Sequence, residues 1–358
     1  MDPILRNLLA FPPGTELISH PMYLAGKLIL QDRSSCLPAH LLAATAANAR
    51  VVDATAAPGN KTTHIAALLG GSSGGKVIAF EKDTRRAEIL RKMVSRAGGD
   101  SVIDIKAGED FLKADPSSRE LREVTHLLLD PSCSGSGIVN REEYTLTPLA
   151  TPEQQGGKGK KRKRGAEKEK EKPAAIIVAA DEGEQEETKE ELGKSRLLAL
   201  ADFQKSMILH AMTFPAARKI TYSTCSIHAE ENEDVVMAVL AHDTARGRGW
   251  RVERREEGTL KDWERRGWPE RCGGDDVVMQ ACVRCNPVED GGIGFFVVAF
   301  VRVSVDGDAA ESAPVVEDME EQEWNGFSDG EHPTGVAVVA TEVAAVAKNK
   351  KRKRQKGK

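Results

Sequence analysis

Short apolar runs alternate with helical patterns along this chain of 358 residues, and no other feature constrains its fold as much. RVVDATA (50–56) has the pattern of a short buried strand that ends at the turn signal Pro58-Gly59, and KTTHIAALLGG (61–71) then has the pattern of a helix closed by glycines. A chain that repeats strand and helix in this way forms a mostly parallel sheet with helices on both faces. The sequence therefore predicts one α/β domain.

The same alternation continues on both sides of a long charged stretch. In TRRAEILRKMVSRAGG (84–99), apolar residues recur at helical spacing. Two apolar segments near the end, 277–285 and 294–303, are expected to form a closing antiparallel pair. Further strands are expected at 76–83, 101–110, 124–132 and 218–226, and further helices at 195–214 and 228–242.

Dense charged runs interrupt this pattern and follow it. Residues 156–172 and 348–358 are strongly basic, whereas 181–191 and 317–324 are acidic, so the formal net charge of -4 conceals a strong asymmetry. Segments with so much charge and so few apolar residues bury too little surface to offset the entropy of ordering, and we expect them to be disordered. The clusters KKRKR and KNKKRKR fit nuclear import or contact with nucleic acid, and we expect a nuclear protein.

Composition narrows the class of protein further. No apolar run approaches the roughly 18 residues of a membrane span, and the N-terminus lacks the basic-then-apolar pattern of a secretion signal. We therefore expect neither a membrane protein nor a secreted one. Six cysteines in a chain of this length do not make a small disulfide framework, so their thiols are available for chemistry or simply buried. Nothing in the sequence suggests an obligate partner, and we expect a monomer.

The ends of the predicted strands are where chemistry is expected, since ligands bind at the carboxyl ends of strands in open α/β sheets. After the first strand, small residues and Gly59 let the backbone approach a ligand closely, and helix amides at Asn60–Thr62 can hold a polar or anionic group. Glu81, after the second strand, is suited to accept ribose hydroxyls. An adenosine-containing cofactor without a pyrophosphate fits this pattern best. A plain turn with a surface glutamate is the alternative.

Two cysteines follow two further strands. DPSCSGSG (130–137) directs Asp130 into the cleft, and YSTCS (222–226) brings Cys225 to the same edge of the sheet as Cys133. A thiolate paired with a carboxyl group that stays partly protonated suits attack on a polarised ring. The alternative for Cys133 is an incidental residue of a Gly/Ser-rich turn.

A metal site is a further alternative for the cysteines. Cys272, Cys282 and Cys285 could supply three zinc ligands, but a matching second pair is missing, and burial in a strand explains Cys282 more simply. The eight histidines show no ligand spacing. We therefore expect no metal.

The motifs DATAAPGNKT, FEKD, DPSCSGSG, YSTCSIHAEENE and GFFVVAFVR occur in the order seen in the Nop/Sun family of RNA cytosine-5 methyltransferases, and the chain resembles that family over about 12–148 and 193–303. The variant DPSC together with APGNKT resembles most closely its fifth eukaryotic Sun-domain branch. The resemblance implies a Rossmann-like class I fold that binds S-adenosylmethionine, with a mostly parallel seven-stranded sheet and an antiparallel edge strand. It also implies methylation of cytosine C5 in large-subunit ribosomal RNA, in the nucleolus, at a base that is single-stranded or flipped from its helix.

The same resemblance implies roles for individual residues. Cys225 would be the nucleophile that adds to cytosine C6, Cys133 would be a second cysteine that helps release the product, and Asp130 would face both the methyl donor and the target base. Glu81 would hold the ribose of the cofactor, and Asp110 would lie near its adenine. The cofactor-binding residues implied by the resemblance are Thr55, Ala56, Ala57, Pro58, Gly59, Asn60, Lys61, Glu81, Arg86, Asp110 and Asp130.

The chain departs from the family pattern in three ways. Thr55 stands in place of a cysteine, Ser132 stands in place of a proline, and the chain begins just ahead of LLAFPPGTE, where members of the branch carry a longer RNA-contacting region. We therefore expect residues 1–49 to be a helical lead-in that is a remnant of that region. The other expected parts are a methyltransferase domain at 50–306, a disordered insertion within it at 150–192 and a disordered tail at 307–358.

Two other functions remain open on the sequence alone. A ribosome-assembly factor that binds RNA without turnover is one of them, although it would not need Cys225, Cys133 and Asp130 to be intact. A methyltransferase that acts on an exocyclic amine is the other, because such enzymes also use an Asp-Pro motif after the fourth strand. Those enzymes need an aromatic residue to stack the base, and this chain has Cys133 at that position.

Overall fold

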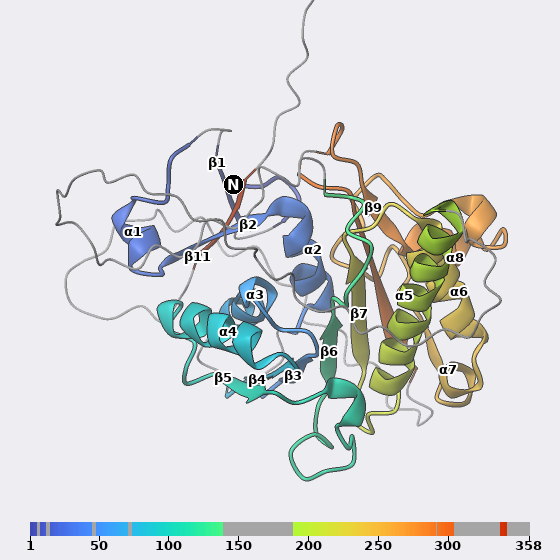
Figure 1. Cartoon of the computed structure of the whole chain (residues 1–358), viewed down its shortest axis with the longest axis horizontal. Coiled ribbons are helices and arrows are strands. Elements are labelled where there is room, and N and C mark those ends of the chain that lie inside the picture. Colours follow the sequence, from blue (N-terminus) through green and yellow to red (C-terminus); the bar gives the residue numbers. More distant parts are fainter. Residues whose placement is uncertain are drawn as a thin grey trace, which may run out of the picture. The chain divides into compact units, whose positions relative to one another are not determined.

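The structure is a computed structural model, and a large sheet of eight strands forms its core (Figure 1). Contacts divide the chain into two units, Met1–Val139 with Leu197–Lys358 and Asn140–Arg196, and the contacts described below lie within the first. The structure describes residues 1–5, 8–11, 15–44, 48–70, 74–138, 189–290, 292–303 and 337–341.

The large sheet is mostly parallel. Its strands are β3 (Arg50–Asp53), β4 (Lys76–Glu81), β5 (Ile103–Ala107), β6 (His126–Leu129), β7 (Lys219–Thr224), β8 (Trp250–Val252), β9 (Val283–Cys285) and β10 (Phe295–Arg302). Five of them run parallel in the order β5-β4-β3-β6-β7, and β10 pairs antiparallel with β7, β8 and β9. The predicted α/β fold with a mostly parallel sheet and an antiparallel edge is confirmed, with eight strands where seven were expected.

Helices cover both faces of this sheet, as parallel strands with crossover connections require. They are α2 (Arg33–Leu42), α3 (Asn60–Leu68), α4 (Thr84–Arg96), α5 (Lys189–Ala211), α6 (Glu233–Ala241), α7 (Asp243–Gly247) and α8 (Asp276–Ala281), with the 3-10 turns η1 (Phe111–Lys113), η2 (Ala229–Glu231) and η3 (Pro269–Arg271). Leu42, Ile65 and Leu90 bring α2, α3 and α4 into one buried layer, and Ile208 and Val236 bring α5 and α6 into the other. No helix among the described residues is both long and apolar enough to cross a membrane.

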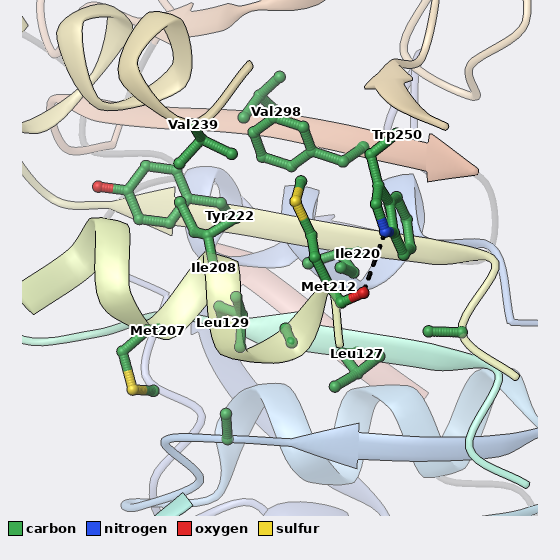
Figure 2. Packing of buried hydrophobic residues seen from close by; sticks show 14 of the residues in the cluster. Leu127, Leu129, Met207, Ile208, Met212, Ile220, Tyr222, Val239, Trp250 and Val298 are labelled. Atoms are coloured by element: carbon green, nitrogen blue, oxygen red, sulfur yellow. Dashed lines mark hydrogen bonds between the residues drawn. The ribbon is translucent and has the colours of Figure 1, made fainter. Parts of the chain in front are cut away.

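Alternate side chains of each strand supply these two layers. In β6, Leu127 and Leu129 join the layer under α5, whereas Leu128 between them joins the layer under α2 and α3. Figure 2 shows the layer under α5, in which Nε1 of Trp250 donates a hydrogen bond to the carbonyl oxygen of Met212 at 3.2 Å. Burial on both faces explains why the strands appear in the sequence as short, nearly continuous apolar runs.

A second, smaller sheet has three parallel strands. They are β1 (Leu8–Phe11), β11 (Ala337–Thr341) and β2 (Leu28–Asp32), in that order, and the short helix α1 (Pro21–Leu24) precedes β2. The expectation of a helical lead-in at 1–49 is therefore wrong where β1 and β2 form. Both strands pair with β11, which comes from the far end of the chain, and a local sequence pattern carries no information about such a partner.

The charged segments are described only in small part. Residues 337–341 of the expected disordered tail form β11, and residues 189–192 of the expected insertion belong to α5. The rest of that insertion, 150–188, and the remainder of the tail beyond 303 lie outside the described residues.

One predicted strand is wrong in its first half. The side chain of Asp275 accepts hydrogen bonds from the backbone N–H groups of Val277 and Val278, and the helix α8 follows. Only Val283–Cys285 of the predicted segment 277–285 is a strand. A favourable helix cap thus outweighs the preference of two valines for extended structure.

Candidate active site

The strand order reverses between β3 and β6, and the loops that follow these two strands meet there. The backbone N–H of Asp130, directly after β6, donates a hydrogen bond to Oγ1 of Thr55 in the loop after β3, at 3.1 Å. In open parallel sheets, such a reversal forms a crevice at the carboxyl ends of the strands. All the site residues predicted from the sequence end or follow strands at this same side of the sheet.

Buried groups fix the loop between β3 and α3. The hydroxyl of Thr62 donates a hydrogen bond to Oδ2 of Asp53 at 2.7 Å, and burial raises the pKa of Asp53 to about 6. Gly59 precedes α3 with a φ of 115°, and a Cβ there would lie 3.0 Å from the side chains of Leu90 and Met93. Only glycine therefore fits this conformation and this space. The first turn of α3 has no side-chain cap, which leaves its amides available to a ligand.

Glu81 lies beside the same loop. Its Oε2 accepts a hydrogen bond from the backbone N–H of Ala57 at 3.3 Å and lies 3.7 Å from Nη2 of Arg86. Arg86 in turn donates to the carbonyl oxygen of Ala57 at 2.7 Å, so the three residues form one hydrogen-bonded group. Asp110, after β5, pairs with Lys82 at 2.8 Å, and the hydrogen bond from Lys82 lowers the pKa of that carboxyl group. Because Lys82 directly follows Glu81, this ion pair brings Asp110 to the same strand end as Glu81.

An ion pair joins the first turn of α3 to the loop after β6. Nζ of Lys61 lies 2.7 Å from Oδ2 of Asp130 and donates to Oγ of Ser35, from α2, at 2.8 Å. The hydroxyl of Ser223 donates to the other oxygen of Asp130 at 2.7 Å. Burial lowers the pKa of Lys61, but the adjacent Asp130 more than offsets this, so the net pKa is raised and the ammonium stays charged.

From the sequence, Lys61 was expected only as part of the cofactor loop, and Ser35 and Ser223 were not predicted. Ser223 could have been found, because alternation along a strand puts it on the same side as Cys225 two residues later. Ser35 gave no such signal, since it comes from a helix in the region expected to be only a lead-in.

The two predicted catalytic cysteines lie in contact. Sγ of Cys133 and Sγ of Cys225 are 3.2 Å apart, and both residues are partly exposed. The hydrogen bond from Cys133 lowers the pKa of Cys225, an effect that burial and Asp130 oppose and Lys61 assists. The same hydrogen bond, together with burial, raises the pKa of Cys133. Cys225 therefore forms a thiolate more readily, while Cys133 remains a thiol that donates to it.

Short contacts fasten the two cysteine loops to each other. Oγ of Ser134 lies 3.1 Å from Oγ of Ser226. The backbone N–H of Gly137 donates to the carbonyl oxygen of Cys225 at 2.9 Å, and the N–H of Gly294 donates to the carbonyl oxygen of Gly137 at 2.8 Å. A Cβ on Gly137 would lie 2.1 Å from the carbonyl oxygen of Gly294, so this approach of backbones requires glycine.

A buried polar network supports the Cys133 loop from the side of α5, and it was not predicted from the sequence. Nε2 of Gln204, on α5, donates to the carbonyl oxygen of Ser132 and to Oε1 of Glu231, each at 3.0 Å. That same Oε1 accepts the backbone N–H of Ser134 at 2.8 Å, and the hydroxyl of Tyr222 donates to Oε1 of Gln204 at 2.9 Å. A glutamine on the buried side of a long helix was the signal available in the sequence.

The three cysteines considered as zinc ligands do not all come together. Cys272 and Cys282 share a hydrogen bond between their thiols, whereas Cys285 packs in a different buried cluster. Among the residues that the structure describes, no group of three or more His, Cys, Asp or Glu side chains is arranged to hold a metal ion.

Profiles of known families match two parts of this chain. The profile of the 16S rRNA methyltransferase RsmB/F matches residues 39–147, and that of the NOL1/NOP2/Sun domain family member 5, ferredoxin-like domain, matches residues 1–31. The chain is also 34% identical over 317 residues to the human protein named putative methyltransferase NSUN5C, covering 86% of this chain and 79% of that protein. The chain belongs to the NOL1/NOP2/Sun family of RsmB/F-type methyltransferases.

Other members of the family are longer than this chain. It is 37% identical over 298 residues to the 25S rRNA (cytosine-C(5))-methyltransferase rcm1 of Schizosaccharomyces pombe, and 38% identical over 305 residues to the 28S rRNA (cytosine-C(5))-methyltransferase of Mus musculus. The alignments cover 83% and 85% of this chain but 54% and 53% of those proteins, so the chain spans about half their length.

These matches confirm the resemblance that the motifs indicated, including the branch, because the match to a domain of family member 5 covers residues 1–31. The same match shows that residues 1–31, within the segment expected to be a helical lead-in, are similar to the ferredoxin-like domain of that family member. The fold agrees with the crystal structure of PH0851, which is 22% identical to this chain with a TM-score of 0.54, over 80% of this chain and 50% of that one.

Proposed function

We propose that this protein transfers a methyl group from S-adenosylmethionine to C5 of a cytosine in RNA, and that this RNA is large-subunit ribosomal RNA. The observation that carries the proposal is the contact of 3.2 Å between the sulfur atoms of Cys133 and Cys225, beside the ion pair of Lys61 and Asp130. Methylation of an exocyclic amine needs no thiol, whereas methylation of cytosine C5 needs a nucleophile to activate the ring. Family membership and the names of the rRNA (cytosine-C(5))-methyltransferases among the relatives support the same substrate.

The residues present fit S-adenosylmethionine. Its ribose hydroxyls are donors, which suits the carboxylate of Glu81 at the end of β4, and its methionine carboxylate suits the uncapped first turn of α3 after Gly59. When bound, S-adenosylmethionine supplies an electrophilic methyl group. We assign cofactor binding to Thr55–Lys61, Glu81, Arg86, Asp110 and Asp130.

Cys225 is the nucleophile in this proposal. Its thiolate adds to C6 of the cytosine, and this addition gives C5 the electron density of an enamine carbon. The hydrogen bond from Cys133 and the charge of Lys61 both lower the pKa of Cys225, which increases its thiolate fraction near neutral pH.

Asp130 and Lys61 handle the charge that develops on the ring. Addition of the thiolate to C6 makes N3 basic, and the ammonium of Lys61 supplies the proton that N3 takes up, through the carboxylate of Asp130. The hydroxyl groups of Ser223 and Ser35 orient these two side chains. The ammonium of Lys61 also lies 5.6 Å from the centre of the Phe295 ring, which limits its freedom to turn away.

Cys133 acts when the product is released. The proton on C5 passes to water, the proton on N3 returns through Asp130 to Lys61, the C5–C6 double bond forms again, and the electron pair of the C6–sulfur bond returns to Cys225. The thiol of Cys133 donates a hydrogen bond to that sulfur and so stabilises the leaving thiolate. The same contact therefore serves both the attack and the departure of Cys225.

The substrate and the setting follow from the same chemistry. A nucleophile reaches C6 only when the base is outside its helix, so the target cytosine is single-stranded or flipped. The basic runs 156–172 and 348–358 fit contact with RNA and nuclear import, and we propose a nucleolar protein that acts as a monomer. In this proposal residues 50–306 form the catalytic domain, and residues 1–49 contribute to RNA contact.

Incubation of the full chain with large-subunit ribosomal RNA and methyl-labelled S-adenosylmethionine tests this function. We expect the label in 5-methylcytosine with the wild type and no label with Cys225→Ala. Label on the exocyclic nitrogen would overturn carbon methylation. If the wild type binds S-adenosylmethionine and RNA in separate titrations yet transfers no label, an RNA-binding assembly factor becomes the better account.

A further inference from the structure

The backbone on both sides of Cys133 is held by a single pair of buried side chains. Gln204 binds the carbonyl oxygen of Ser132, and Glu231 binds the N–H of Ser134, with 3.0 Å and 2.8 Å between the respective heavy atoms. The two side chains also bind each other at 3.0 Å. They come from α5 and η2, which lie far from Cys133 in the sequence.

Apart from the hydrogen bond that Oε1 of Gln204 accepts from the hydroxyl of Tyr222, the side-chain hydrogen bonds of these two residues join them to the loop and to each other. Gln204 and Glu231 are both fully buried, at 0% exposure. Oε1 of Glu231 accepts the hydrogen bonds from Ser134 and from Gln204, and Oε2 has no hydrogen-bond partner among the described residues. No basic side chain of the described residues forms an ion pair with Glu231 either. Burying a carboxylate without a cation lowers the stability of the fold. The position of Glu231 is therefore explained by its hydrogen bonds to the loop and to Gln204, and not by a gain in stability.

The contact that the network supports is a sensitive one. The hydrogen bond between the thiols of Cys133 and Cys225 spans 3.2 Å, and hydrogen bonds weaken steeply as distance and angle depart from their best values. A loop with a glycine at 135 and another at 137 does not hold one side-chain position by itself. A fixed position of Cys133 therefore needs support from outside the loop.

We propose that Gln204 and Glu231 are positioning residues that hold the thiol of Cys133 against Cys225 during product release. The proposal rests on the proposed function of this site. In that step the C5 proton passes to water, the N3 proton returns through Asp130 to Lys61, the C5–C6 double bond forms again, and the electron pair of the C6–sulfur bond goes to Cys225. Without the network, Cys133 moves away, the leaving thiolate loses its hydrogen bond, and the covalent adduct of RNA and protein persists.

The test measures attack and release separately in the full chain. Each variant is mixed with large-subunit ribosomal RNA and labelled S-adenosylmethionine, and three quantities are recorded: methyl transfer in a single turnover, steady-state turnover, and the adduct that survives denaturation. For Gln204→Leu we expect single-turnover transfer within a few fold of wild type, steady-state turnover lower by roughly tenfold, and accumulated adduct. Glu231→Leu is expected to behave in the same way.

Two matched variants separate positioning from general loss of stability. Ile208→Ala removes a fully buried side chain of the same helix from a core cluster that contains no residue of 130–137, so it should lower Tm without accumulating adduct. Glu231→Gln keeps an acceptor for Ser134 and for Gln204, so it should release product faster than Glu231→Leu. If Gln204→Leu does not fold, Gln204→Met, which has a similar length and volume, answers the same question.

The outcomes distinguish this proposal from the one on which it rests. If Cys133→Ala accumulates adduct but Gln204→Leu and Glu231→Leu release product as Ile208→Ala does, the positioning role is overturned. If Cys133→Ala itself forms no adduct, the release role assigned to Cys133 fails first, whatever the other variants show.

Discussion

Cys133 and Cys225 lie side by side after β6 and β7, and Cys272 and Cys282, which directly follow η3 and α8, also lie side by side. We call the first the strand-end pair and the second the buried pair. In both, the hydrogen bond between the thiols lowers the pKa of one sulfur and raises that of the other. The two pairs are therefore polarised in the same way.

A cation assists the lowered thiol in both pairs as well. Lys61 lowers the pKa of Cys225, and Arg284 lowers that of Cys272. Carboxylates near each pair act in the opposite direction. Local electrostatics alone would therefore not tell which pair belongs to a catalytic site.

Access is what separates the two pairs. Both members of the strand-end pair are partly exposed, whereas Cys272 and Cys282 are 0% exposed. A Cβ added at Gly267 would lie 2.9 Å from Cβ of Cys282, which shows how closely the chain packs there. A polarised pair of thiols becomes a candidate site when it lies at the carboxyl ends of parallel strands, where a substrate can reach it.

The largest expected difference between the pairs is in methyl transfer. Cys225→Ala should reduce transfer to RNA by roughly a thousandfold or more, because loss of a nucleophile removes a whole reaction path. Cys272→Ala should leave transfer within a few fold of wild type and cost about 1 kcal/mol of stability. Labelled-methyl assays and denaturant titrations of the two variants check both parts. A Cys272→Ala variant that folds but transfers no methyl group would contradict the assignment of catalysis to the strand-end pair alone.

The next difference concerns trapped intermediates. Cys133→Ala should accumulate a covalent RNA–protein adduct, because the departing thiolate of Cys225 loses the hydrogen bond that stabilises it. Cys282→Ala should accumulate none, and its effect should be confined to a lower Tm from the cavity it leaves. Gel shifts after denaturation, with and without nuclease, measure the adduct. Equal amounts of adduct in the two variants would contradict the assignment of Cys133.

The position of the strand-end pair could be predicted from the sequence, whereas the side chains that support it could not. Each cysteine follows an apolar run, and parallel strands bring such ends together, so the convergence of Asp130, Cys133 and Cys225 could be predicted. Their supporting residues could not, because Gln204 and Glu231 lie 72 and 97 residues from the loop atoms they bind. Side-chain contacts at that separation depend on helix packing, which periodicity does not define.

The fold shows the same division between local and long-range information. The alternation of strand and helix predicted β3 to β7 and their helices, since both patterns depend on nearest neighbours in the sequence. The strands β1 and β2 were missed because their partner β11 comes from the other end of the chain. The first half of the predicted strand 277–285 is wrong because the cap made by Asp275 stabilises a helix there despite two valines, whereas Val283–Cys285 is a strand as predicted.

Chemical labelling of the folded protein should show a smaller but direct difference. With iodoacetamide at neutral pH, Cys225 should react at least about a hundredfold faster than Cys272 or Cys282, since the buried pair reacts only after an opening that costs about 3 kcal/mol or more. Mass spectrometry of the labelled peptides over time gives the rates. In denaturant the three rates should become similar. Fast labelling of Cys272 in the native protein would show that the buried pair is not protected.

The smallest expected effect is a shift in the pH dependence of that labelling. Lys61 favours the thiolate of Cys225, so Lys61→Met should raise the pKa of Cys225 and slow its alkylation severalfold below the midpoint. Lys82→Met is a suitable control, because Lys82 pairs with Asp110 and does not contribute to the pKa of Cys225. Alkylation rates between pH 6 and 10 give the midpoints.

Either result sharpens the comparison of the two pairs. A shift with Lys61→Met alone would mean that the strand-end pair depends on a cation held in place by Asp130, in addition to its access to solvent. Identical midpoints for Lys61→Met and Lys82→Met would mean that the thiol of Cys133 alone lowers the pKa of Cys225. In that case Cys133→Ala should produce the whole shift, and the two pairs would differ in access and in nothing else.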